Sequence, residues 1–213
     1  FIYLEINFQV VLIMGLAGAC RKEQLTNLLF ENVKDETHVF YVRIPNTKTK
    51  ISPDFFITSG NIKGGNLVEV VRKYVHLGPI HAKHRRFFLR YRKGKCITQP
   101  VGINPIGCMP KKIASFLNLP NVEGFTGHTF RRSSASLLAD SGADLLTVKR
   151  HGGWRSNTVA EGYIETSSEN KKRIASKILG NENVQAEPSV NSYNKSIEII
   201  TANTRELSSS AIN

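Results

Sequence analysis

The stretch that decides the fold and the chemistry runs from Thr126 to Tyr163 and reads TGHTFRRSSASLLADSGADLLTVKRHGGWRSNTVAEGY. His128 and Arg131 are three residues apart, so on a helix their side chains project from one face and can bind one ligand together. Trp154 and Tyr163 are nine apart, which allows a turn and a short helix to return the phenol to the same point. Converging donors and a tyrosine suit chemistry on a phosphate, because donors neutralise the equatorial oxygens while a hydroxyl attacks in line.

Each of these residues also has an ordinary interpretation when it is taken alone. His128 fits the surface of a helix, Trp154 fits a core anchor, and Tyr163 is one of six tyrosines. Their joint spacing favours a site over three unrelated residues.

The composition favours a polyanionic partner. The 213 residues carry a formal net charge of +12, and the last 33 are acidic, so residues 1–180 are more basic still. Such a field attracts nucleic acid first and anionic membranes second. Ribosomal and chromatin proteins are equally basic, so charge sets the class of partner and not the activity.

The cysteines and histidines predict neither disulfides nor a metal centre. Cys20, Cys96 and Cys108 are odd in number and widely spaced, which is typical of a reducing compartment without structural zinc. His81 and His84 have the only metal-like spacing, and the cations beside them favour a basic surface instead. We expect no metal and no cofactor.

The apolar residues 8–19 are too short for a membrane span and lack the basic start of a signal peptide. We expect a buried helix there, with Gly15 and Gly18 marking close packing or a break, and no association with a membrane. Position 1 is phenylalanine rather than methionine, so we expect the chain to begin inside a domain.

Hydrophobic periodicity predicts a mainly α fold (α+β) with a small antiparallel β-sheet. We expect strands at 38–44 and 51–58 joined by a hairpin at 45–50, and helices at 8–19, 21–30, 65–77, 110–117, 127–140, 144–151, 157–164 and 169–179. Residues 1–180 form one domain in this interpretation. Residues 181–213 turn Asn/Ser-rich and lose periodicity, which predicts a disordered tail.

Residues 72–95 interleave many cations with Phe87, Phe88 and Tyr91. One interpretation is a solvated basic strand over buried aromatics, and the other is a surface that follows the DNA backbone. The side chains that we expect to contact DNA are Lys50, Arg72, Lys73, Arg85, Arg86, Arg90, Arg92, Arg132 and Arg155.

Two further candidates precede the central stretch. Arg21 opens a helix, whose N-terminal dipole and free N–H groups help to bind an anion. Lys48 lies at the hairpin tip, from which its ammonium can reach a leaving oxygen as a general acid. Lys50 shares that tip and remains a rival for the same role.

The ordered set Arg21, Lys48, His128, Arg131, Trp154 and Tyr163 resembles the catalytic domain of tyrosine recombinases, the phage-integrase superfamily, and within it the Crypton-type recombinases of eukaryotic mobile elements. That family shows an early Arg, a hairpin Lys, His-x-x-Arg, and then His or Trp nine residues before the Tyr. The resemblance covers roughly residues 8–180. It implies the integrase catalytic-core fold and DNA cleavage and rejoining without metal or ATP.

The resemblance also implies a role for each residue. Tyr163 attacks a DNA phosphodiester and holds a 3′-phosphotyrosine, and Lys48 protonates the departing 5′-oxygen. Arg21 and Arg131 clamp the non-bridging oxygens through bidentate forks. Trp154 donates its indole N–H to one of those oxygens, and His128 hydrogen-bonds the phosphate or helps to move the tyrosine proton.

Some positions depart from the family pattern. Gln24 stands where the family has an acidic residue, three positions after the first Arg. His151 precedes Trp154 by three residues and competes for the His/Trp position, although the nine-residue interval to Tyr163 favours Trp154. We expect these 213 residues to lack the N-terminal DNA-binding domain that completes the family's clamp.

The resemblance implies double-stranded DNA as the partner, a homo-tetramer on DNA and, through the Crypton relatives, the nucleus. Residues 169–179 are either passed to a neighbouring protomer or packed on their own domain. Two alternatives stay open: a domesticated DNA-binding module that does not cut, and an enzyme similar to type IB topoisomerases.

Overall fold

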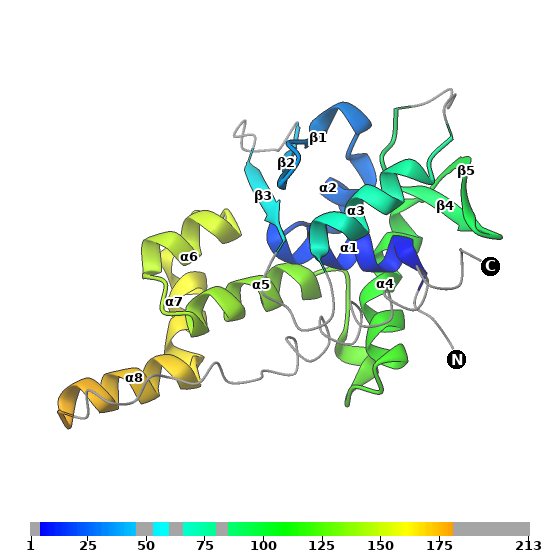
Figure 1. The fold of residues 1–213 in the computed structure, drawn as a ribbon. Helices are drawn as coiled ribbons and strands as arrows, with labels where there is room; N and C mark the ends of the chain where they lie inside the picture. The colour runs from blue at the N-terminus through cyan, green and yellow to red at the C-terminus, as the bar shows by residue number, and fades with distance from the viewer. Residues whose placement is uncertain (1–4, 46–52, 60–65, 80–84, 181–213) are drawn as a thin grey trace.

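The computed structural model describes residues 5–45, 53–59, 66–79 and 85–180. This part of the chain is mainly helical, with two small antiparallel sheets (Figure 1). Its α-helices are α1 (Ile6–Ala17), α2 (Lys22–Asn27), α3 (Leu67–His76), α4 (Ile103–Phe116), α5 (Thr129–Asp140), α6 (Leu145–Gly152), α7 (Asn157–Thr166) and α8 (Ser168–Ile178).

The first sheet has the strand order β1–β2–β3 and is antiparallel throughout. Its strands are β1 (Val33–Asp35), β2 (Val39–Arg43) and β3 (Asp54–Thr58), and the register pairs Val39 with Thr58 and Arg43 with Asp54. The expected pairing of the two longer strands is confirmed, whereas the tip between them lies outside the described residues. The second sheet is the hairpin β4 (Leu89–Arg92) and β5 (Lys95–Pro100).

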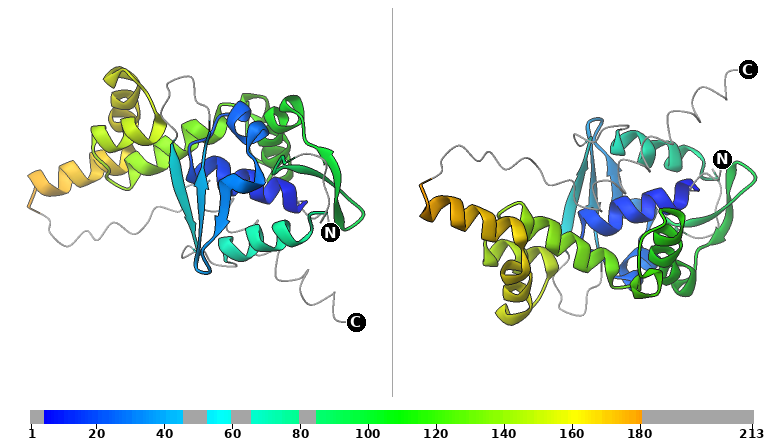
Figure 2. Two further views of the ribbon diagram at one scale, coloured as in Figure 1. Left: turned by 90° about the horizontal axis from the view of Figure 1, so that it is seen from above. Right: turned by 90° about the horizontal axis from the view of Figure 1, so that it is seen from below.

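Helix α1 is the centre of the main core. Val10, Val11 and Met14 are fully buried, and α3, α4, α5 and β3 pack around the helix (Figure 2). The close packing expected at its glycines is confirmed, because a Cβ at Gly15 would collide with the ring of Phe130 on α5. This close approach fixes α5 against the end of α1.

A second, smaller core lies between α5, α6 and α7. Its buried members are Ala135, Ala139, Val148 and Ala160, and partly buried side chains, Trp154 and Tyr163 among them, pack against it. Small side chains let these helices approach closely, so the aromatic pair packs against three closely packed helices.

Two predicted helix boundaries are wrong, and two strands were not predicted. Helix α4 begins at Ile103 instead of Pro110, which lies inside it, and Pro105 falls in the first turn, where no N–H donor is needed. The helix expected at 21–30 ends at Asn27, followed by a single 3₁₀ turn at Phe30–Asn32. Strands β1 and β5 were not expected; the first is too short to carry a pattern of alternation.

Helix α8 projects away from the body in every view (Figures 1 and 2). Ser167 caps it, because its hydroxyl accepts from Asn170 N–H at 3.1 Å and donates to Asp140 at 2.7 Å. None of the described helices combines the length and the apolar character that crossing a membrane requires.

Candidate active site

Arg131 is the centre of the site. It lies in the first turn of α5, is only 7% exposed, and donates from Nη1 to the Ala19 carbonyl at 3.3 Å and from Nη2 to the Gly152 carbonyl. Burial and then the positive charge of Arg21 lower the pKa of Arg131 to about 10. The guanidinium is therefore still charged at neutral pH, and the two carbonyls fix its plane.

The glycine pair at the end of α6 places the indole against this guanidinium. Gly153 has a left-handed φ of +58° and ends the helix, and a Cβ at Gly152 would collide with the ring of Trp154. The indole folds back over the helix end, and the Arg131 Cζ lies 5.2 Å from its ring centroid. The two glycines thus bring Trp154 onto the face of Arg131.

Tyr163 lies on α7 and stacks on Trp154, with ring centroids 5.2 Å apart and an interplanar angle of 21°. Partial burial raises the pKa of Tyr163, while the charges of Arg132 and Arg131 oppose the rise. The phenol is therefore protonated at neutral pH and lies within the field of two cations. Of the four residues expected to converge, these contacts bring together three: Arg131, Trp154 and Tyr163.

Arg21 immediately precedes α2, as expected from the sequence, and its side chain is exposed. Its charge lowers the pKa of Arg131, so the two guanidinium groups lie near each other. Gln24, at the position where an acid was expected, accepts from the Arg21 N–H at 2.7 Å through Oε1. An uncharged amide thus fixes the backbone of Arg21 and leaves the charge of its guanidinium uncancelled.

His128 is the residue before α5, and its ring is exposed and makes no capping hydrogen bond. Thr126 and Thr129 close this turn instead, since Thr126 N–H donates to the Thr129 hydroxyl at 2.8 Å. The predictions for Lys48 and Lys50 fall outside the described residues, so their roles stay predictions.

Two of the cations expected to contact DNA are held in ion pairs. Arg72 Nε lies 2.7 Å from Asp35 Oδ2, and its Nη1 lies 2.5 Å from Glu69 Oε1. Arg85 pairs with Glu31. The pair with Asp35 joins α3 to β1, and the pair with Glu31 joins the segment before β4 to the 3₁₀ turn before β1. Both arginines therefore have a structural role in addition to any contact with DNA.

The remaining cations that we expected to contact DNA differ in their solvent exposure and in their hydrogen bonds. Arg86 donates to the Thr26 carbonyl at 2.8 Å and is partly buried. On β4, Arg90 and Arg92 are exposed while Phe87 and Phe88, just before the strand, are buried, as the basic-strand interpretation expects. The other exposed members of the set are Lys73, Arg132 and Arg155.

One further side chain beside the site was noticed in the sequence only as a rival of Trp154. His151 Nε2 lies 2.6 Å from the Ser134 hydroxyl, which donates to the Leu16 carbonyl at 2.6 Å. Nothing in the spacing of His151 and Ser134 pointed to this contact. It arises because α5 and α6 cross near the end of α1.

The fold matches solved structures of DNA recombinases. The XerH site-specific recombinase bound to palindromic difH substrate, in a post-cleavage complex, superposes with a TM-score of 0.58 at 20% identity, over 80% of this chain and 45% of that chain. XerA recombinase gives 0.61 at 13% identity, over 82% and 57%. The Tn1549 transposon integrase in complex with circular intermediate DNA gives 0.51 at 16% identity, over 80% and 59%.

These likenesses show the fold: the chain has the architecture of the tyrosine recombinase catalytic core, as expected from its sequence. The chain spans about half the length of these proteins. No family model matches the sequence, and no curated protein sequence does so either.

Proposed function

We propose that this chain, which has the fold of the tyrosine recombinase catalytic core, cleaves and rejoins DNA strands through a 3′-phosphotyrosine at Tyr163. Arg131 and Arg21 bind the non-bridging oxygens of the scissile phosphate, and Trp154 donates its indole N–H to one of them. This is site-specific recombination, and DNA is the substrate.

The observation that carries the proposal is the uncompensated charge of Arg131. Within the described residues no carboxylate pairs with this buried guanidinium, and the charge with the largest effect on its pKa is a second guanidinium, that of Arg21. Holding a buried guanidinium beside a second positive charge is unfavourable unless an anion joins them. A phosphodiester is such an anion, and Tyr163 lies beside it as a nucleophile.

The chemical step follows from the balance of protons. The Tyr163 oxygen forms a bond to phosphorus as the bond from phosphorus to the 5′-oxygen breaks. The phenolic proton passes to His128 or to solvent, and Lys48 gives a proton to the departing 5′-oxygen. The reverse step rejoins the strand, because the phosphotyrosine conserves the energy of the broken bond. This balance needs neither a metal ion nor ATP.

Assembly on DNA involves α8 in this proposal. Ile178 and Leu179 are 76% and 78% exposed, and Ile174 is 49% exposed, so the apolar face of the helix is uncovered in one chain. We place this face against a second copy, within a tetramer that exchanges strands between two duplexes. The chain's origin in a mobile element of the Crypton type, and its action in the nucleus, belong to the same proposal.

The test is covalent capture on a library of nicked suicide duplexes, with wild type and Tyr163→Phe compared in parallel. We expect adducts that survive SDS, share a DNA sequence and are absent from the variant, while both proteins bind DNA equally. DNA binding that is steeply salt-sensitive, with no adduct from wild type, would instead favour a non-cutting DNA-binding module. Relaxation of supercoils without exchange between duplexes would favour a topoisomerase.

A further inference from the structure

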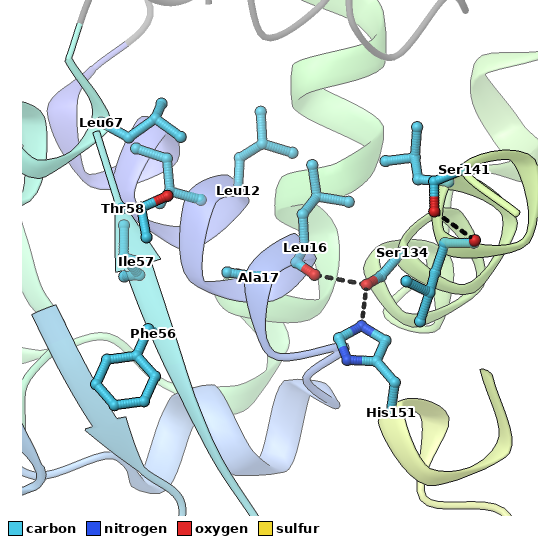
Figure 3. Close-up of a pocket in the computed structure, with 13 residues that line it drawn as sticks. Leu12, Leu16, Ala17, Phe56, Ile57, Thr58, Leu67, Ser134, Ser141 and His151 are labelled. Carbon is cyan, nitrogen blue, oxygen red and sulfur yellow. Dashed lines mark hydrogen bonds between the residues drawn. The ribbon is translucent and has the colours of Figure 1, made fainter. Parts of the chain in front are cut away.

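A hydrogen-bonded chain of three groups runs beside the site, and Figure 3 shows it at the edge of a cavity. His151 Nε2 lies 2.6 Å from the Ser134 hydroxyl, and that hydroxyl lies 2.6 Å from the Leu16 carbonyl. Ser134 has one hydroxyl proton, and a carbonyl can only accept, so this proton goes to Leu16. His151 must therefore donate, which places the proton of the neutral imidazole on Nε2.

This chain runs parallel to the contacts of Arg131. Arg131 and Ser134 lie one turn apart on α5, and each joins the end of α6 to the end of α1. Arg131 does so through the carbonyls of Gly152 and Ala19, whereas Ser134 does so through His151 and the Leu16 carbonyl. A phosphate competes for the N–H groups of Arg131, but it does not compete for the second cross-link.

We propose that His151 is a positioning residue: its bond to Ser134 keeps the end of α6 in place and so orients the Arg131 guanidinium and the Trp154 indole for the phosphate. The inference rests on the proposed function. When a phosphate takes some of the N–H groups of Arg131 away from the protein carbonyls, the bond between His151 and Ser134 still holds the Arg131 guanidinium and the Trp154 indole in position.

The surroundings of His151 keep it uncharged in this role. Burial and then the charge of Arg131 lower its pKa, so the imidazole is neutral at pH 7. The cavity of about 370 Å³ beside it is lined from α1, β3, the start of α3 and α5 by residues without charge. On its own helix, Lys149 and Arg150 are the charged neighbours. A neutral donor joins α6 to α5 without adding a third cation near Arg131 and Arg21.

The test compares two substitutions of similar size. His151→Gln introduces an amide N–H₂ that can replace the Nε2–H donor, whereas His151→Leu removes the donor and keeps the volume. Trp154 is the only tryptophan of the chain, so its emission and its quenching by acrylamide report directly on the indole. Single-turnover covalent capture and the Kd for DNA are measured on the same proteins.

His151→Leu should change the Trp154 emission, increase its quenching, and slow capture about 10- to 100-fold, the scale expected when a reacting group is misplaced. DNA affinity should change by less than about threefold, since it depends mainly on phosphate contacts distributed over the surface. His151→Gln should restore both the emission and the rate. Ser134→Ala should match His151→Leu, and the double variant should be little worse, because both changes break one chain.

Wild-type emission and capture rate in His151→Leu would overturn the proposal. So would a loss of rate that only follows a lower Tm and that Gln does not restore. If His151→Leu does not fold, the same readouts on Ser134→Ala decide the matter. The fluorescence needs no DNA, so a wild-type protein that captures no DNA would refute the proposed function while the emission still decides the role of His151.

Discussion

Replacing Arg131 by methionine should separate stability from chemistry. The pKa of Arg131 lies at about 10 instead of 12.5 because the group is buried and lies near the positive charge of Arg21. At about 1.4 kcal/mol for each pKa unit, holding this charge costs the folded protein about 3 kcal/mol. Methionine removes that cost and fills much of the same volume.

The substitution also removes favourable contacts. Two hydrogen bonds to carbonyls contribute about 1 kcal/mol each, and the contact with the Trp154 ring about 0.5–1 kcal/mol. Gain and loss nearly cancel, so the free energy of unfolding of Arg131→Met should stay within about 1 kcal/mol of wild type. For a domain of this size that is a Tm change of roughly 2–4 °C. Covalent capture should nevertheless fall about 10²–10³-fold, the scale for losing a donor to the transition state.

The assays are a thermal melt and single-turnover capture on the nicked duplex, with Arg150→Met as the control. Arg150 is exposed on α6 and has no place in the site, so both quantities should stay at wild-type values. A Tm that falls by more than about 10 °C in Arg131→Met would mean that the residue is structural. Capture at the wild-type rate would remove it from the site.

Further predictions concern the stability of the fold and its surfaces. The pKa of His151 lies below its ordinary 6.5, so the unfolded chain binds this proton more readily. Stability should therefore fall as pH drops below about 6.5, and denaturant unfolding of His151→Gln should show less of this decline. Arg92→Ala should reduce the slope of log Kd against log salt by about 0.9, whereas Arg72→Ala, which breaks two ion pairs, should chiefly lower Tm. Ile178→Asp should leave Tm unchanged and weaken self-association on DNA in sedimentation experiments; undiminished association would exclude α8 from the interface.

The longer helices and strands could be predicted from the sequence because their buried apolar residues recur with the repeat of a helix or a strand. Leu67 and the valines of α3, and the alternation in β2 and β3, indicated the type and pairing of these elements correctly. Boundaries were less predictable where a proline is tolerated. Pro110 suggested a helix start, yet the helix continues through it because burial of Ile106 and Met109 favours packing the earlier turn against α1.

The site was predictable only in part, for a physical reason. Arg131, Trp154 and Tyr163 could be placed together because their spacing constrains them. The groups that orient Arg131 are the carbonyls of Ala19 and Gly152, and every residue has a carbonyl, so no residue type reveals them. Among the groups that position the site, only Gly152 and Gly153, which allow Trp154 to fold back, can be recognised from their residue type.

The most direct test of the account is to locate the bond to DNA within the protein. The adduct formed on a nicked duplex is digested with nuclease and protease, and the modified peptide is sequenced by tandem mass spectrometry. We predict a 3′-phosphonucleotide on Tyr163, formed in the presence of EDTA. A nucleotide on any other of the six tyrosines, a 5′-linkage, or an adduct that requires Mg²⁺ would contradict it.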